Sequence, residues 1–206
     1  MPKHILTASD AETILNQPDT NTITGIRDRA IMEVLYSTGM RRMELVNLKT
    51  TDIDIDRGTI LIRHGKGDKD RMIPIGERAI QWIEKYLNEC RPELAIGMSE
   101  NILFLNTYGE EIGLTWLSRI VRNYIDKANI NKTGSCHLFR HTMATLMLEN
   151  GADIRYIQAM LGHAKLDTTQ IYTQVSIQKL KDIHTATHPA KNKLTNQLPS
   201  ESETKH

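Results

Sequence analysis

Cationic side chains gather in a few short segments of this chain. Arg41 follows shortly after a glycine in TGMRRMEL, and Lys66 lies between glycines in HGKGDKDR. His137 and Arg140 are three residues apart in HLFRH, which places them on one face of a helix. His163 comes directly after another glycine. These segments could together supply several hydrogen-bond donors to one anionic substrate.

Such a set of donors is suited to cutting a phosphodiester without a metal ion. Arginine presents a planar, permanently charged fork that matches phosphate, and one preorganised donor can lower a barrier by about 3–4 kcal/mol. Tyr172, nine residues after His163, offers a phenol that could hold the phosphate as a covalent ester. Because a phenol has a pKa of about 10, a base or nearby cations must assist its ionisation. Lys66 could protonate the leaving alkoxide as a general acid.

Each of these residues also has an ordinary structural explanation. Arg41 lies beside Arg42, and the residues alone do not tell which of the two would act. Glu44 could pair with either arginine, and Tyr172 could be a packing residue. His141 is expected to be structural and hydrogen-bonded within the core. The ordered combination, rather than any one residue, indicates function.

Composition indicates a globular intracellular protein. The chain has 206 residues, of which 39% are hydrophobic and 25% charged. No apolar run approaches the 18 residues of a membrane span, and MPKHILTASD lacks a signal region. The two cysteines, Cys90 and Cys136, exclude a disulfide framework and favour the reducing cytoplasm. No Cys/His cluster has zinc spacing, so no metal is expected.

Periodicity predicts a mainly α protein with a small antiparallel β-sheet, of the α+β class. Strands are expected near 52–55, 59–64 and 71–75, with Pro74 on an edge. The run 102–105 has no clear type. Helices are expected at 10–17 after an N-cap at Ser9 or Asp10, 24–38 before Gly39, 43–48, 77–90, 114–128, 137–150 before Gly151, 153–161 before Gly162, 168–172 and 176–184. We expect residues 1–9 to be a leader or linker, 10–188 a catalytic domain and 189–206 a polar, disordered tail.

The motifs resemble those of the tyrosine recombinases, or phage-type integrases, and most closely their Xer-like branch. The stretch HLFRHTMATLMLENGADIRYIQAMLGHAKLDTTQIYTQV is similar to the family's C-terminal signature, and TGMRRMEL and GKGDKDRMIPI to its upstream signatures. The resemblance covers about residues 5–188. It implies the catalytic-domain fold of that family and site-specific DNA recombination through a 3′-phosphotyrosyl intermediate, as in integration of mobile elements, with no metal or other cofactor.

The resemblance also implies a role for each motif residue. Arg41 and Arg140 would clamp the scissile phosphate, and Lys66 would protonate the departing 5′ oxygen. His137 would be the general acid or base near the phenol. His163 would hydrogen-bond a phosphate oxygen, Tyr172 would be the nucleophile, and Glu44 would support the site.

Net charge by itself argues weakly against DNA binding. It is only +1, from 26 basic and 25 acidic residues. The expected cleft would focus the cations, while Asp52, Asp54 and Asp56 would lie on the far side of the sheet or turn. Candidates for contact with the DNA backbone are Lys69, Arg71, Arg119 and Arg122.

The chain departs from the family in length and at Gln174, where Xer-like members usually have His. About 80–100 further N-terminal residues, which form a helical clamp in typical members, are not part of this sequence. A truncated, non-catalytic DNA-binding remnant is therefore the alternative reading. In the family, the last helix docks into a neighbouring protomer of a synaptic tetramer. The apolar stripe of 176–184 could do so here, or it could pack on its own core.

Overall fold

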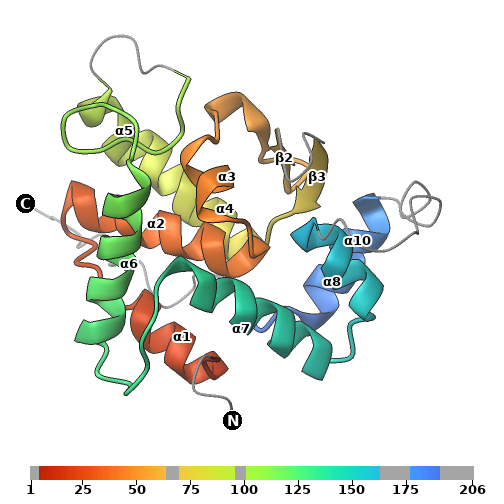
Figure 1. Cartoon of the computed structure of the whole chain (residues 1–206). Coiled ribbons are helices and arrows are strands. Elements are labelled where there is room, and N and C mark those ends of the chain that lie inside the picture. Colours follow the sequence, from red (N-terminus) through yellow and green to blue (C-terminus); the bar gives the residue numbers. More distant parts are fainter. Residues whose placement is uncertain (1–4, 64–69, 96–100, 163–176, 191–206) are drawn as a thin grey trace, which may run out of the picture.

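The computed structural model describes residues 5–63, 70–95, 101–162 and 177–190. These ranges form a mainly helical body with a small antiparallel sheet at one side (Figure 1), as predicted. The helices are α1 (Ala8–Leu15), α2 (Ile23–Thr38), α3 (Arg42–Val46), α4 (Glu77–Lys85), α5 (Arg91–Leu94), α6 (Leu114–Lys127), α7 (Cys136–Glu149), α8 (Ile154–Leu161) and α10 (Ile177–Thr187). The strands are β1 (Ile53–Asp54), β2 (Thr59–Ile62) and β3 (Arg71–Pro74). Within the described ranges, none of the helices is long and apolar enough to cross a membrane.

The centre of the fold is α2, which is buried along almost its whole length. Every residue from Gly25 to Thr38 is buried. The helices α4 and α7 pack against it, and α1 also contacts it. A helix enclosed on all sides has no solvent-facing stripe, so each charged residue on it needs a partner within the protein. The apolar spacing that predicted this helix revealed only one of its buried faces.

Ion pairs supply those partners and join three helices. Arg29 of α2 donates from Nε to Glu33 Oε1 at 2.9 Å. From α4, Arg78 donates to Glu33 Oε2 at 2.9 Å and to Glu12 Oε1 of α1 at 2.8 Å. Removing one partner from a buried pair leaves an uncompensated charge, which is strongly destabilising. This network therefore fixes α1 and α4 on α2.

The first helix begins earlier than the sequence predicted. Thr7 caps α1 through its side chain, so the helix begins at Ala8. Leu6 is fully buried, and its backbone N–H donates to Thr142 Oγ1 of α7 at 3.1 Å. The chain from Leu6 onward is thus packed on the body and is not a free leader.

The sheet has the predicted antiparallel order β1-β2-β3. Pro74 lies on the edge strand β3, opposite Thr59, as expected for a residue that cannot donate to the ladder. Asp52 differs from the prediction, because it is buried rather than on the far side of the sheet. Its carboxylate accepts a hydrogen bond from Arg63 Nε at 2.7 Å, which explains why a charged group is tolerated there.

The segment after the sheet differs from the prediction in detail. The single helix predicted at 77–90 is α-helical only to Lys85 and continues as a π-helical turn, Tyr86–Cys90. The run 102–105 forms isolated β-bridges. The helices predicted near 114–128 and 137–150 are observed as α6 and α7. The helix predicted at 168–172 and the tail beyond 190 lie outside the described residues.

Glycines end α2 and α8 where the sequence predicted. Gly39 has φ 61° and Gly162 has φ 63°, both in the left-handed region that other residues adopt at a cost. A Cβ atom at Gly39 would overlap Met143 of α7 and would lie 2.9 Å from Leu161 of α8. The end of α2 is therefore in close contact with α7 and α8, and the chain turns there.

The last helix, α10, is seated on its own chain. Leu180 is buried in a cluster with Met143 and Met147 of α7. The Nε2 of His184 donates to the Ser37 carbonyl at 2.7 Å. The helix extends to Thr187, beyond the predicted end at 184. Two residues of its apolar stripe, Leu180 and Ile183, thus pack on the chain's own core, and docking of this helix into a neighbouring protomer stays a prediction.

A second histidine, just beyond the end of α10, makes a similar contact with α2. His188 Nε2 donates to the Tyr36 carbonyl at 2.9 Å, and its ring stacks on that of His184 with centroids 4.6 Å apart. Both side chains are buried. Burial lowers the pKa of both imidazoles, and the neighbouring His184 lowers the pKa of His188 further. The neutral forms are therefore the ones that fit the folded protein.

This contact makes stability depend on pH. The folded protein binds fewer protons at His184 and His188 than the unfolded chain, whose histidines titrate near pH 6.5, so stability is complete above that pH and falls below it. We expect the free energy of unfolding to decrease by up to about 1.4 kcal/mol per histidine for each pH unit below about 6.5. Urea unfolding at pH 7.5, 6.5 and 5.5 measures this. His188→Gln should weaken the dependence, whereas replacing the exposed His141 should preserve it. A free energy of unfolding that is equal at pH 7.5 and 5.5 would contradict the prediction.

Candidate active site

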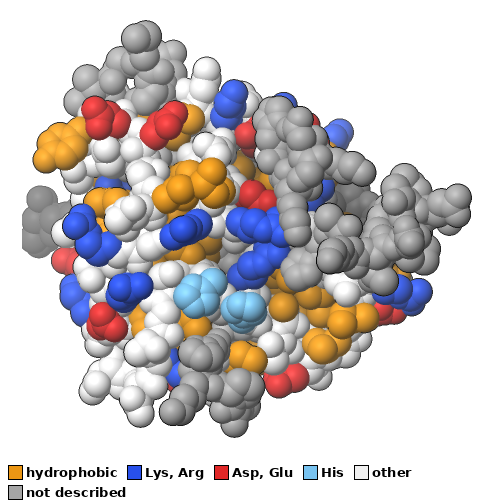
Figure 2. All heavy atoms as spheres, viewed as in Figure 1, with side chains coloured by type: hydrophobic (Ala, Val, Ile, Leu, Met, Phe, Trp, Pro, Cys, Tyr) orange, Lys and Arg blue, Asp and Glu red, His pale blue; other side chains and the backbone are white. Residues whose placement is uncertain are grey.

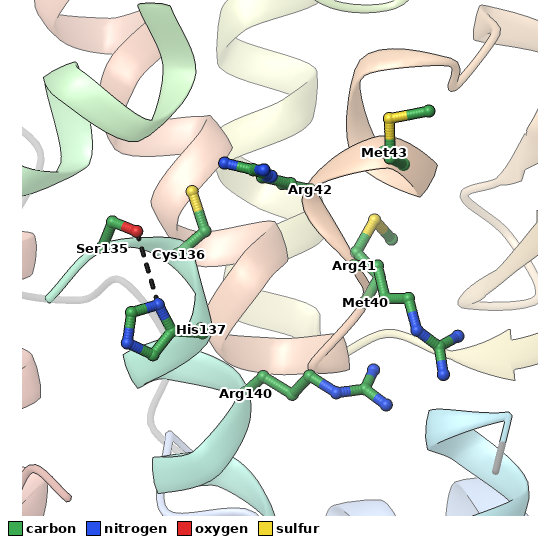
Figure 3. A pocket seen from close by; sticks show the side chains of 8 residues that line it. All are labelled: Met40, Arg41, Arg42, Met43, Ser135, Cys136, His137 and Arg140. Atoms are coloured by element: carbon green, nitrogen blue, oxygen red, sulfur yellow. Dashed lines mark hydrogen bonds between the residues drawn. The ribbon is translucent and has the colours of Figure 1, made fainter. Parts of the chain in front are cut away.

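A cavity of about 450 Å³ opens between the α2–α3 connection and the start of α7. Figure 2 shows that Lys, Arg and His side chains gather in the middle of one face of the molecule. The residues that line the cavity are Met40, Arg41, Arg42, Met43, Ser135, Cys136, His137 and Arg140 (Figure 3). It thus combines candidates from two of the motifs found in the sequence.

Arg41 is positioned by the turn that ends α2 and begins α3. Its backbone N–H donates to Glu44 Oε2 at 2.8 Å, which ties Arg41 to the first turn of α3. Its guanidinium donates to Glu44 Oε1 at 3.0 Å and to the Gly162 carbonyl at 3.3 Å. The side chain remains 31% exposed, so it can still reach a ligand in the cavity.

The structure distinguishes the roles of Arg41 and Arg42, which the amino-acid sequence alone did not. Arg42 donates to Ser118 Oγ of α6 at 2.9 Å. In Figure 3 the guanidinium groups of Arg41 and Arg140 lie on the same side of the cavity, whereas that of Arg42 points toward Cys136. Arg41 is therefore the one that can act together with Arg140.

Arg140 enters the site from the first turns of α7. Its Nη1 donates to the Gly39 carbonyl at 2.6 Å and its Nη2 to the Leu161 carbonyl at 2.9 Å. Partial burial and the nearby charge of Arg41 lower its pKa to about 10, which leaves it protonated at neutral pH. The guanidinium groups of Arg41 and Arg140, which line one cavity, favour an anion between them.

Glu44 joins Arg41 to a further arginine, Arg71 of β3. Arg71 donates from Nη1 to Glu44 Oε1 at 2.8 Å and from Nη2 to Glu44 Oε2 at 2.9 Å. Burial would raise the pKa of the Glu44 carboxyl, but hydrogen bonds from Arg71 and from the Arg41 backbone outweigh it and hold the pKa below its usual value. Glu44 is thus a stable carboxylate, which fits the supporting role that the sequence suggested.

Arg71 is not placed to contact the DNA backbone. Its side chain is only 15% exposed, and its guanidinium is bound to Glu44 rather than facing solvent. Residues two apart on a strand share a face, and Ile73 is buried on the face of Arg71, while Met72 is exposed on the other. The sequence did not indicate this orientation, because Met72 and Pro74 are apolar like Ile73 and leave no polar and apolar alternation around Arg71.

His137 is exposed at the start of α7, and its Nδ1 is 3.4 Å from Ser135 Oγ. It lines the same cavity as Arg140, as the spacing of HLFRH predicted. His141 is not the structural core residue that was expected, because it is exposed one helical turn further on. Its ring lies edge-on to that of His137 with centroids 6.2 Å apart. A position four residues after His137 on the same helix face explains this.

The remaining candidates are placed only in part. Arg119 and Arg122 are exposed on α6. Lys66, Lys69, His163 and Tyr172 lie outside the described residues, so their roles stay predictions. Within the described ranges, no group of His, Cys, Asp or Glu side chains could hold a metal ion.

Known proteins resemble this chain over most of its length. Residues 4–179 match the model of the phage integrase family. Tyrosine recombinase XerC 2 of Ralstonia nicotianae is 49% identical over 191 residues, which cover 93% of this chain and 55% of that protein. The crystal structure of XerA recombinase superposes with a TM-score of 0.70 at 35% identity, covering 88% of this chain and 62% of that one.

A DNA-bound structure is also similar. The pre-cleavage complex of XerH site-specific recombinase with its difH substrate has a TM-score of 0.69 and 30% identity, covering 82% of this chain and 50% of that one. The chain therefore spans about half to two thirds of the length of these relatives. Because the family model matches well over half of the chain and the fold agrees, the chain belongs to the phage integrase family of tyrosine recombinases, in its Xer-like branch.

Proposed function

We propose that this chain cleaves and rejoins DNA at specific sites through a covalent 3′-phosphotyrosyl intermediate. The observation that carries the proposal is the shared cavity of Arg41, Arg140 and His137, which come from distant parts of the sequence. Two relatives support the same reaction: one is named a tyrosine recombinase, and the other is named a site-specific recombinase and is bound to its difH substrate before cleavage.

The proposed reaction balances without an external energy source. The Tyr172 oxygen attacks the scissile phosphorus and forms a P–O bond as the bond to the 5′ oxygen breaks. His137 takes the phenolic proton, and Lys66 gives a proton to the departing 5′ oxygen. Arg41, Arg140 and His163 stabilise the charge on the non-bridging oxygens. A 5′-hydroxyl of the partner strand then attacks the phosphotyrosine and restores a phosphodiester.

The charge pattern supports duplex DNA as the substrate despite the net charge of +1. The cavity brings together guanidinium groups, and the exposed Arg119 and Arg122 are available for phosphate contacts beyond it. Phosphate contacts dominate affinity and make it sensitive to salt. We therefore expect salt-dependent binding.

The first prediction concerns the nucleophile. Incubation with a library of nicked duplexes, which lose the 5′-hydroxyl fragment after cleavage, should give a covalent DNA–protein band that resists denaturation. Tyr172→Phe should abolish this band, because a phenyl ring has no oxygen to attack phosphorus. Sequencing the trapped DNA would identify the target site.

The outcomes of this experiment separate the alternatives. A band that persists in Tyr172→Phe would reject this tyrosine as the nucleophile. Salt-sensitive binding without any band would favour a non-catalytic remnant. In a separate assay, relaxation of a supercoiled circle without a partner site would favour a topoisomerase. Absence of both binding and cleavage would overturn the proposed function.

The second prediction distinguishes the two adjacent arginines. Arg41→Gln should lower the single-turnover cleavage rate about 100- to 1,000-fold, the usual cost of losing one preorganised donor. Arg42→Gln is the matched control, because that side chain donates to Ser118 on the other side of the cavity. Its loss in rate should be at least about tenfold smaller. Equal losses in the two variants would refute the assignment of Arg41.

We further propose that copies of this chain assemble as a tetramer on two DNA sites, because exchange of both strands of two duplexes requires four cuts. The helix 176–184 could link the copies only by leaving the contacts that Leu180 and His184 make with their own chain. Light scattering with a duplex carrying one site should show protein dimers, and addition of a second duplex should yield tetramers. Recombinant products formed without any tetramer would contradict this assembly.

A further inference from the structure

The C-terminal end of α8 is held by arginines from three different elements. The Met160 carbonyl accepts from Arg71 Nε at 3.2 Å. The Leu161 carbonyl accepts from Arg140 at 2.9 Å and the Gly162 carbonyl from Arg41 at 3.3 Å. The last carbonyls of a helix lack partners within it and carry partial negative charge, so cationic donors suit them. The residues expected to bind phosphate thus also fix the end of α8.

Arg71 differs from the other two arginines in how its donors are used. Its Nε binds Met160, and both Nη atoms bind the Glu44 carboxylate. The backbone of Gly162 lies against it so closely that a Cβ there would be 3.0 Å from its Cζ. A guanidinium that is engaged along both edges and 15% exposed is not placed to bind a substrate phosphate.

Glu44 is the group through which Arg71 reaches the cavity. The same oxygen, Oε1, accepts from Arg71 at 2.8 Å and from Arg41 at 3.0 Å. The carboxylate has two oxygens, and Arg71 binds both in the bidentate geometry that fixes orientation best. Arg71 therefore determines the direction in which Glu44 holds Arg41.

We propose that Arg71 is a positioning residue for the reaction, which couples the Glu44–Arg41 pair to the end of α8. The proposal rests on the proposed function. Because His163 follows Gly162 directly in the sequence, fixing Gly162 also fixes the point from which the segment carrying His163 and Tyr172 leaves α8. The Arg71 guanidinium thus fixes both the orientation of Arg41, which would bind phosphate, and the position at which the chain leaves α8.

The chain offers a closely matched control for Arg71. Arg63 follows strand β2 of the same sheet and binds the buried carboxylate of Asp52 at 2.7 Å. Asp52 accepts from the Lys49 backbone N–H, just as Glu44 accepts from that of Arg41. Arg63→Met therefore removes another arginine pair with a buried carboxylate outside the cavity, although the Arg63 side chain is 45% exposed and that of Arg71 only 15%.

The kinetic test compares Arg71→Met, Arg71→Lys and Arg63→Met on the trapped DNA site. Misplaced reacting groups can cost about 100-fold in rate, so Arg71→Met should lower single-turnover cleavage by about 10- to 100-fold. Its Kd for DNA should change less than about threefold, because Arg71 does not touch substrate. Arg71→Lys, which keeps the charge, should recover part of the rate. Arg63→Met should cleave like the wild type.

The dependence of cleavage on pH separates positioning from loss of stability. Among the described residues, the charged groups that face Glu44 are Arg41, Arg71 and Arg140. Without the hydrogen bonds of Arg71, less opposes the effect of burial and the pKa of Glu44 should rise. As the pH is lowered, cleavage by Arg71→Met should therefore begin to slow at a higher pH than cleavage by the wild type. Arg63→Met should not show this shift. Glu44→Gln combined with Arg71→Met should be no slower than the slower single variant.

Two measurements do not depend on cleavage. In a ¹³C titration, the Glu44 midpoint should rise in Arg71→Met and stay in place in Arg63→Met. Amide exchange of residues 159–162 should accelerate only in Arg71→Met. Unchanged titration and exchange, or losses that multiply in the double variant, would overturn the proposal. If the wild-type protein cleaves no DNA, the proposed function fails, while these two measurements still decide whether Arg71 couples Glu44 to α8.

Discussion

Guanidinium groups repel one another, so a cleft that collects several of them needs acceptors to hold each in place. Here the acceptors are the Glu44 carboxylate and the last carbonyls of α8. The single negative charge of Glu44 offsets only part of the positive charge of the two arginines that it binds, Arg41 and Arg71. The surplus remains at the cavity, where it can attract the phosphate of a substrate. The site is therefore stable without a ligand and still favours an anion.

The geometry of this cleft depends on α2. The helix is buried from Gly25 to Thr38 and is followed by Gly39, whose left-handed backbone turns the chain toward Arg41. The carbonyl of Gly39 also anchors Arg140 of α7. At the same end of α2, the carbonyl of Ser37 anchors His184 of α10. The end of α2 thus joins the site to the packing of the last helix.

Net charge conceals this arrangement because many acidic residues are paired in the interior or at its edge. Asp28, Glu33 and Asp52 each bind an arginine away from the cavity. The two charges of each pair neutralise each other, so the pairs contribute little to the electrostatic field outside the protein. Among the described residues, Arg41, Arg42, His137 and Arg140 line one cavity, so a chain with almost equal numbers of basic and acidic residues can present a basic cleft.

The sequence by itself determined the fold class, the helix ends at Gly39 and Gly162, the edge position of Pro74 and the shared face of His137 and Arg140. These features depend on local backbone preference and on helix or strand periodicity, which neighbouring residues encode. Only the tertiary structure decided between Arg41 and Arg42. It also left His141 exposed to solvent, placed Asp52 in the interior and turned Arg71 inward onto Glu44. Each of these depends on a partner brought close by folding, such as Ser118 for Arg42 or the end of α8 for Arg71. Local pattern does not contain the position of such a partner, because long-range packing sets it.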